Sequence, residues 1–369
     1  MGAGSSPRPP RTSSSWSRMD LADLAARVRQ ETRINASPRD MERVLAAILT
    51  SEDMWRVLEL AEVPLLVVCS ALRALAAEGR VRWDTGLIRL TAEGEEACAR
   101  LGIAPVRTLD CPRCRGRGVE GGFLHDVATA FHRIAAHRPE ASQEFDQGYV
   151  TEDTTIARIA MLWRRGDLAG KDLLILGDDD LVSVAAALTR LPRRVAVLDA
   201  DPRITSFVEE VASQEGLGIE AFAHDLRQPL PREVERQFDV FSCDPTESLP
   251  GFLLFAGRGV SALRGPGSAG YLGLTHAEAS LAKWRAIQEE LLAWGAVLTD
   301  LRDGFHTYVN WPYVEAMRGW EHLPVRRVPG RLEPWYRSAL VRIELVTEAK
   351  VELGCVPGNI FLDDEAATT

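Results

Sequence analysis

The sequence lacks the features that mark secreted, membrane-spanning and disulfide-rich proteins. Its 369 residues contain no unbroken apolar run of membrane-spanning length. The Ser-, Pro- and Arg-rich opening has no apolar core of the signal-peptide type, so residues 1–20 are predicted to be a disordered leader. Six scattered cysteines do not suit a disulfide scaffold, and we expect a cytoplasmic protein with no membrane partner.

Basic charge is scarce in the larger, C-terminal part of the chain. Residues 1–120 hold 18 Arg and 16 Asp or Glu, a net charge of +2, whereas residues 121–369 hold 25 Lys or Arg and 37 Asp or Glu, a net of −12. Such an acidic surface attracts cations and disfavours nucleic acid, although it also serves solubility alone. The length predicts two domains with separate cores.

The N-terminal domain is predicted to span residues 21–105. Helical segments lead to two short alternating runs, "RVRW" and "LIRL", and then to a helix capped by Thr91. This order is typical of a winged helix-turn-helix. The segment is nearly neutral, however, so a role in packing or dimerisation is favoured over DNA binding.

The connector, residues 106–150, carries "CPRCRGRG" at 111–118. A CxxC on a glycine-rich turn is half of a zinc knuckle, but zinc usually takes four ligands and the other four cysteines form no second pair. A metal site, a redox site and a turn with two ordinary thiols all remain open, and no metal is assigned.

Residues 151–350 are predicted to form an α/β domain with a Rossmann-like, doubly wound sheet of the class I methyltransferase type, followed by a tail at 351–369. Apolar strands alternate with helical segments, beginning with "DLLILGDDD" and "RVAVLDADPR". Ligands of such sheets bind beyond the carboxyl ends of the strands. The acidic residues that accumulate at these ends are Asp178, Asp179, Asp180, Asp199, Asp225, Asp244 and Glu247.

These strand ends favour an adenosine ligand that carries no carboxylate. A carboxylate closing the second strand commonly binds ribose hydroxyls, which Asp199 fits, and Asp225 is placed to hold the adenine amino group. No GxGxxG turn is present for a dinucleotide, and three aspartates after Gly177 would repel the carboxylate of S-adenosylmethionine. The same aspartates would attract an ammonium, so decarboxylated S-adenosylmethionine is the predicted co-substrate, with no prosthetic group.

The sequence also resembles a known family, the branched-chain polyamine synthases. The resemblance rests on "GDDDLVS", "FDVFSCDPTES" and "FDQGYVTEDTTIARIAMLWRRGDLAGKDLLILGDDD", and it runs from about Leu21 to beyond Trp311, with the CPxCxGxG connector included. It implies transfer of aminopropyl groups from decarboxylated S-adenosylmethionine to the central nitrogen of spermidine, with release of methylthioadenosine. Pro245-Thr246 departs from the double proline expected after the fourth-strand aspartate, which bears on the acceptor pocket.

The chemistry assigns roles to these residues. The attacking amine must lose a proton while its other ammoniums stay bound, so Asp180 and Asp244 are the predicted catalytic residues. The predicted co-substrate ligands are Gln147, Gly177, Asp178, Asp179, Asp199 and Asp225, and the predicted polyamine ligands are Asp146, Glu247 and Tyr271.

Several alternatives stay open at this stage. Asp178 would equally serve as a cap of the following helix. Tyr271, Trp311 and Tyr336 are candidates to line an apolar tunnel around methylene chains, but aromatics at such positions more often serve packing. The helix at 154–163 is expected to be core. A methyltransferase on the same sheet and a winged-helix regulator that senses a polyamine are the rival functions. We expect a homodimer without a nucleic-acid partner.

Overall fold

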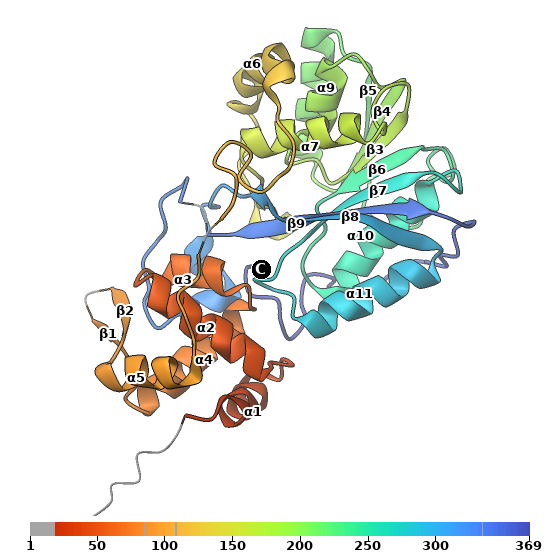
Figure 1. Ribbon diagram of the computed structural model, residues 1–369. Helices are drawn as coiled ribbons and strands as arrows, with labels where there is room; N and C mark the ends of the chain where they lie inside the picture. The colour runs from red at the N-terminus through yellow and green to blue at the C-terminus, as the bar shows by residue number, and fades with distance from the viewer. Residues whose placement is uncertain (1–18, 85, 108, 334) are drawn as a thin grey trace, which may run out of the picture.

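The computed structural model describes residues 19–369 except residues 85, 108 and 334, and the chain forms a helical N-terminal region and a larger α/β region (Figure 1). Of the predicted leader, residues 1–18 lie outside the described residues. Asp20 accepts hydrogen bonds from the backbone N–H groups of Ala22 and Asp23 and so caps the first helix.

Helices and one hairpin make up the N-terminal region. The predicted order of helices, hairpin and helix is present, and the hairpin strands pair antiparallel. Ser37 and Asp40 form a reciprocal capping box at the second helix. The elements are α1 (Leu21–Thr32), α2 (Pro38–Thr50), α3 (Met54–Ala61), α4 (Leu65–Ala77), β1 (Val81–Asp84), β2 (Leu87–Leu90) and α5 (Ala92–Leu101).

The N-terminal region shares a hydrophobic core with loops of the α/β region. The ring of Trp55, on α3, lies 4.6 Å from that of Trp335, measured between centroids. The Trp55 indole also donates to the carbonyl of Arg327 at 2.8 Å. Trp311 and Tyr336 belong to the same core. The helical region therefore packs against the segments that carry these two aromatics.

Helices α3 and α4 are the most apolar part of this region. Within the described residues, no single helix is long and apolar enough to cross a membrane. The two helices meet the length and composition criteria only together, and they are bent by 116° at their junction.

A connector leads from α5 to the α/β region. It contains η1 (Gly122–Leu124), α6 (His125–Ala135) and η2 (Gln143–Phe145), and it ends at α7 (Glu152–Arg164). Helix α6 packs on α7 and α8 (Val182–Leu188) above the sheet (Figure 1).

The central sheet has seven strands in the order β5-β4-β3-β6-β7-β9-β8. The first five are parallel in an order that reverses between β3 and β6, as in Rossmann-like sheets. Strand β9 runs antiparallel to both β7 and β8 and was not predicted. The strands are β3 (Asp172–Leu176), β4 (Arg194–Asp199), β5 (Ile219–Ala223), β6 (Val240–Cys243), β7 (Ala269–Leu274), β8 (Ala296–Thr307) and β9 (Arg337–Leu345).

Helices cover both faces of this sheet. Ile175 of β3 packs into the core beneath α7, α8 and α9 (Pro202–Glu215), while its neighbour Leu176 packs into the core under α10 (Leu249–Ala262) and α11 (Leu281–Ala293) (Figure 1). Strand β3 is therefore buried on both sides, which explains its continuous apolar run. The predicted α/β, Rossmann-like fold is confirmed, with a mixed sheet.

Candidate active site

A cavity of about 380 Å³ opens beyond the carboxyl ends of β3, β4 and β6, where the strand order reverses. Among the lining residues that the structure describes, eight carry carboxylates and one carries a guanidinium, Arg227, which is already paired with Asp225. The predicted site residues that line the cavity are Asp146, Gln147, Gly177, Asp179, Asp180, Asp199, Asp225, Asp244 and Glu247.

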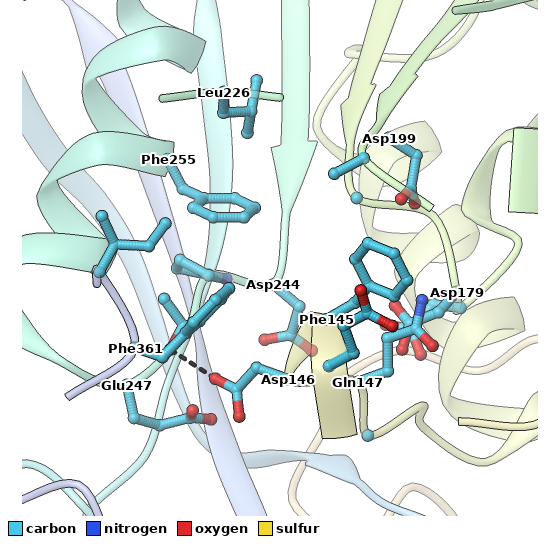
Figure 2. A pocket seen from close by; sticks show the side chains of 18 of the residues that line it. Phe145, Asp146, Gln147, Asp179, Asp199, Leu226, Asp244, Glu247, Phe255 and Phe361 are labelled. Atoms are coloured by element: carbon cyan, nitrogen blue, oxygen red, sulfur yellow. Dashed lines mark hydrogen bonds between the residues drawn. The ribbon is translucent and has the colours of Figure 1, made fainter. Parts of the chain in front are cut away.

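The acidic turn after β3 directs its first two aspartates in different directions. Gly177 adopts a φ of 72°, and Asp179 lines the cavity without a hydrogen-bond partner among the described residues (Figure 2). Burial, with Asp180 and Asp199 nearby, raises the pKa of Asp179 well above its usual value. An unpaired carboxylate held in this way is a ready counter-ion for a bound ammonium.

Asp178 does not line the cavity, so the structure gives no support to its prediction as a co-substrate ligand. Its carboxylate turns back to the start of α8, where it accepts from the Ser183 hydroxyl and from the Ser183 N–H at 3.2 Å. Burial raises the pKa of Asp178 to about 8. The alternative of a capping role is the one the contacts support.

Tyr271 does not line the cavity either, so the structure gives no support to its prediction as a polyamine ligand. It lies in the interior of β7, and its hydroxyl donates to Asp167. Arg342 of β9 donates to the same tyrosine hydroxyl at 3.1 Å. Of the three aromatics considered for a tunnel, Trp311 and Tyr336 line the cavity.

One end of the cavity suits a nucleoside. Asp199 accepts the N–H groups of Asp178 and Asp201, both at 2.8 Å, so its carboxylate is fixed at the end of β4. Apolar side chains of Leu226 and Phe255 face this end of the cavity (Figure 2). Apolar side chains beside a fixed carboxylate match a purine with an attached ribose.

Gln147 reaches the cavity, but its amide group is already engaged. The amide nitrogen donates to Asp201 at 2.9 Å, and the amide oxygen accepts from the Ser142 N–H at 2.9 Å and from Arg203 at 3.2 Å. These contacts hold the loop before α7 in place, and Gln147 as a co-substrate ligand stays a prediction.

A buried arginine joins the two predicted catalytic aspartates. Arg158 of α7 pairs with Asp180 and, at 2.6 Å, with Asp244. Asp180 also accepts the Val150 N–H at 2.6 Å, which engages both of its oxygens. Arg158 was missed because helix 154–163 was interpreted as core; a lone arginine within that apolar stretch was the available signal.

Asp244 keeps one oxygen free of hydrogen-bond partners within the described residues. Its Oδ2 accepts from Arg158 and from the Tyr308 hydroxyl at 2.7 Å, whereas Oδ1 lies over Gly273 of β7. Burial raises the pKa of Asp244, although Arg158 opposes this shift. A buried carboxylate with one free oxygen and a raised pKa is suited to accept a proton.

The opposite end of the cavity holds Asp146 and Glu247 (Figure 2). Asp146 accepts from the hydroxyls of Thr246 at 2.6 Å and Thr369 at 2.9 Å, and Glu247 accepts from Tyr336 at 2.7 Å. Burial raises the pKa of both carboxyl groups. Burying them without a cation is unfavourable, and this end is therefore suited to an ammonium.

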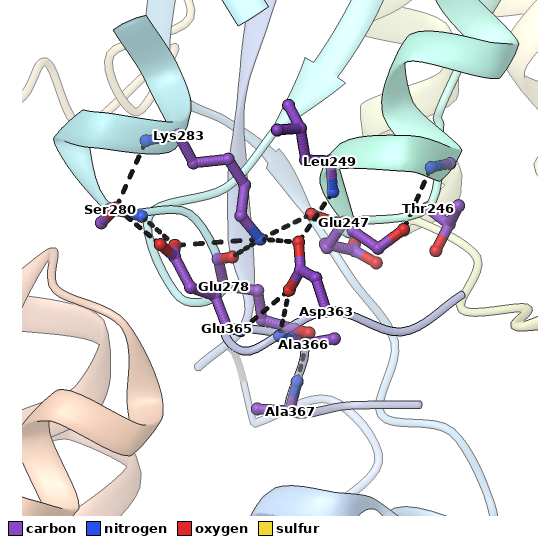
Figure 3. Close-up of polar contacts among 12 residues, drawn as sticks. Thr246, Glu247, Leu249, Glu278, Ser280, Lys283, Asp363, Glu365, Ala366 and Ala367 are labelled. Atoms are coloured by element: carbon purple, nitrogen blue, oxygen red, sulfur yellow. Dashed lines mark hydrogen bonds and ion pairs between the residues drawn. The ribbon is translucent and has the colours of Figure 1, made fainter. Parts of the chain in front are cut away.

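Residues of the predicted C-terminal tail form part of the cavity wall. Ile360, Phe361 and Thr368 line it. The segment is held by Lys283 of α11, whose ammonium pairs with Asp363 at 2.8 Å (Figure 3). The same ammonium donates to the carbonyls of Glu247, which lines the cavity, and Glu278. This contribution was not foreseen, because no local pattern in residues 351–369 indicates what the segment packs against.

Comparison with known proteins identifies relatives over nearly the whole chain. A family model described as the branched-chain polyamine synthase A C-terminal domain matches residues 126–369. An N(4)-bis(aminopropyl)spermidine synthase from Thermus thermophilus is 49% identical over 349 residues, covering 94% of this chain and 98% of that protein. A protein of the same name from Thermococcus kodakarensis is 42% identical over 95% of this chain and 100% of its own length.

A solved structure has the same fold throughout. The branched-chain polyamine synthase from Thermus thermophilus, in complex with N4-aminopropylspermidine and 5'-methylthioadenosine, superposes with a TM-score of 0.90 at 48% identity. The match covers 95% of this chain and 98% of that chain.

Proposed function

This chain belongs to the branched-chain polyamine synthase family, and on that premise we propose that it transfers aminopropyl groups from decarboxylated S-adenosylmethionine to the secondary amine of spermidine. Methylthioadenosine leaves when the bond between sulfur and the aminopropyl carbon breaks. The observation that carries the proposal is the cavity at the carboxyl ends of the strands, which has a nucleoside-shaped end and a carboxylate-lined end.

The donor is placed by the strand ends of β3, β4 and β5. Asp199 binds the ribose hydroxyls, and Asp225 and Leu226 lie where the adenine would sit. Asp179 pairs with the ammonium of the aminopropyl group, because its carboxylate is the one in the acidic turn that faces the cavity without a partner.

The acceptor is placed by Asp146 and Glu247, which bind the ammoniums of the polyamine. Trp311 and Tyr336 flank the methylene chain between them. With both ends of the polyamine held, the central nitrogen is positioned beside the donor carbon, and this positioning supplies much of the rate acceleration.

The proton of the attacking amine goes to Oδ1 of Asp244. The amine then donates its lone pair to the carbon next to the sulfonium, and the electron pair of the broken bond returns to sulfur. Asp180 shares Arg158 with Asp244 and adds negative charge near the developing ammonium. Both aspartates thus keep predicted roles in the reaction, with Asp244 as the base.

The N-terminal region serves packing rather than DNA binding in this proposal. Its order of helices and hairpin is that of a winged helix, and Trp55 contacts the loop that carries Trp335. Six free cysteines are consistent with the reducing cytoplasm as the setting.

The test is incubation with decarboxylated S-adenosylmethionine and a panel of amines, with the products read by mass spectrometry. We expect methylthioadenosine together with spermidine heavier by one or two aminopropyl groups on its central nitrogen. Intact S-adenosylmethionine is the control donor. Methylation of any amine with that donor, or transfer only to primary amines, would contradict the proposal.

A further inference from the structure

The CPRC turn at 111–114 has the backbone geometry of a metal knuckle. The Arg115 N–H donates to the Cys111 carbonyl at 2.7 Å, and the Arg117 N–H donates to the Cys114 carbonyl at 2.9 Å. Arg115 and Gly116 both adopt positive φ, at 50° and 85°. This turn directs the N–H groups of Arg113 and Cys114 at the Cys111 sulfur.

The turn is anchored firmly to the α/β region. The buried guanidinium of Arg117 donates to the Phe305 carbonyl and to the Thr154 hydroxyl, both at 2.8 Å. Arg164 at the end of α7 donates to the Gly118 carbonyl at 2.8 Å. The two thiols are therefore presented at a fixed position, with Cys111 exposed and Cys114 half-buried.

Two thiols alone make an incomplete site. Within residues 19–369, leaving aside 85, 108 and 334, no group of three or more His, Cys, Asp or Glu side chains is arranged to hold a metal. Zinc in structural sites is almost always four-coordinate, and tetrahedral tetrathiolate sites take zinc or iron. The missing two ligands must therefore come from outside the chain.

We propose that two copies of this chain pair their CPRC turns across a twofold axis, so that Cys111 and Cys114 of both copies hold one zinc or iron ion. A twofold contact supplies the same two ligands twice, which completes four. The surroundings fit such a contact: Leu109 is 89% exposed and Phe123, which packs edge-on against Trp163, is 62% exposed. Exposed Arg115 offsets part of the negative charge of a tetrathiolate, whereas Arg113 is already paired with Glu120.

Assembly needs no oxidant. Each of the four thiols releases one proton to solvent as its sulfur binds the metal, so the ion keeps its oxidation state and affinity rises with pH. The site lies outside the catalytic cavity, and none of its ligands lines that cavity.

The experiment combines metal analysis with mass in solution. Full-length protein purified without chelators is measured by inductively coupled plasma mass spectrometry and by size-exclusion chromatography with light scattering. We expect about 0.5 zinc or iron per chain and a dimer, because one tetrahedral ion is shared by two chains. Cobalt substitution should give the charge-transfer and d–d bands of a tetrahedral tetrathiolate.

Single variants identify the ligands. Cys111→Ser and Cys114→Ser should each lose the metal and shift the protein to a monomer, while transferase activity and the circular dichroism spectrum are retained. Cys355→Ser, at another exposed cysteine, is the matched control and should keep both metal and dimer. Protein without bound metal, one full metal per monomer, or an intrachain disulfide two hydrogens lighter by mass would each overturn the proposal.

Discussion

At the scale of single residues, catalysis in this cavity depends on which carboxylate oxygens are already engaged. Both oxygens of Asp180 have partners in Val150 and Arg158. Asp244 shares the same arginine through Oδ2 and leaves Oδ1 over Gly273. The arginine thus orients two carboxylates with one side chain, and only one of them has an oxygen available for a proton.

Replacing the proposed base, Asp244, should abolish aminopropyl transfer and leave methylthioadenosine binding largely unchanged. In Asp244→Asn, the amide cannot accept a proton, so turnover should fall by about 100-fold or more. Calorimetry should show methylthioadenosine affinity within about threefold of wild type, since an amide can still accept from Arg158 and Tyr308. Turnover near the wild-type rate would place the base elsewhere.

Removing Arg158 should destabilise the fold. Arg158→Met would leave Asp180 and Asp244 buried without their counter-ion, at a cost of about 3–5 kcal/mol in the free energy of unfolding. Arg165→Met, at the C-terminal cap of the same helix, is the matched control, because its pair with Asp300 is partly exposed and longer, at 3.8 Å. We expect less than about 1 kcal/mol there. If urea denaturation shows the same loss of unfolding free energy in both variants, the buried ion pairs of Arg158 do not stabilise the fold as expected.

Asp178 should contribute a pH dependence to stability. Its pKa is about 8 in the fold and about 3.9 when unfolded. Between these values only the folded state keeps the proton, so stability falls as pH rises from about 4 to about 8, by at most about 1.4 kcal/mol per pH unit. Asp178→Asn cannot lose a proton and should show a shallower decline in denaturation series at pH 5 to 8. Parallel curves for the two proteins would contradict this assignment.

The sequence could predict that Asp178 and Asp179 lie in the turn after β3, but not which of the two faces the ligand. Their identity and position after β3 predicted an acidic turn at the ligand. Which carboxylate faces the ligand depends on backbone torsions: Gly177 and Leu181 both adopt positive φ, and Asp178 turns to Ser183 between them. Leucine is not a residue whose identity signals that conformation.

At the scale of the element, β7 supports the site through a residue without a side chain. A Cβ at Gly273 would lie 1.8 Å from Oδ1 of Asp244, which is far inside contact distance. The carboxyl end of β7 can therefore approach the end of β6 only with glycine at this position.

Gly273→Ala should therefore displace Asp244 and lower turnover by about 100-fold, because small displacements of reacting groups are costly. Gly218→Ala is the matched control, since a Cβ there meets nothing within 4 Å. Steady-state kinetics on both variants checks the expectation. A wild-type rate in Gly273→Ala would show that Asp244 has room to move without loss.

Prediction at this scale was good for the parallel strands and failed for β9. Continuous apolar runs followed by Asp-containing turns located β3, β4 and β6 and the cavity at their ends. Strand β9 inserts between β7 and β8, although it follows β8 in the chain. That placement depends on a distant pairing and leaves no local signal.

At the scale of the whole molecule, the eight cavity carboxylates should make acceptor binding sensitive to salt. As ionic strength rises from roughly 0.01 to 0.15 M, the screening length shrinks from about 30 to 8 Å. The KM for spermidine should rise across this range, while the affinity for uncharged methylthioadenosine changes little. A spermidine KM that is indifferent to salt would contradict recruitment by these carboxylates.

The cavity itself is assembled from segments far apart in the chain. Loops at the ends of the parallel strands could be predicted, because parallel topology brings their carboxyl ends to one edge. The residues at 360–368 and the aromatics supported by Trp55 could not, since their positions depend on Lys283 and on packing between regions.

The close contact between Gly273 and Asp244 also limits which substitutions the active site can accept during evolution. Any amino-acid replacement there adds atoms where Oδ1 of Asp244 lies. A lineage or a laboratory library that varies position 273 alone will therefore mostly yield inactive chains. We expect new acceptor preferences to be more accessible through positions such as Thr246, which border the cavity without closing on the base.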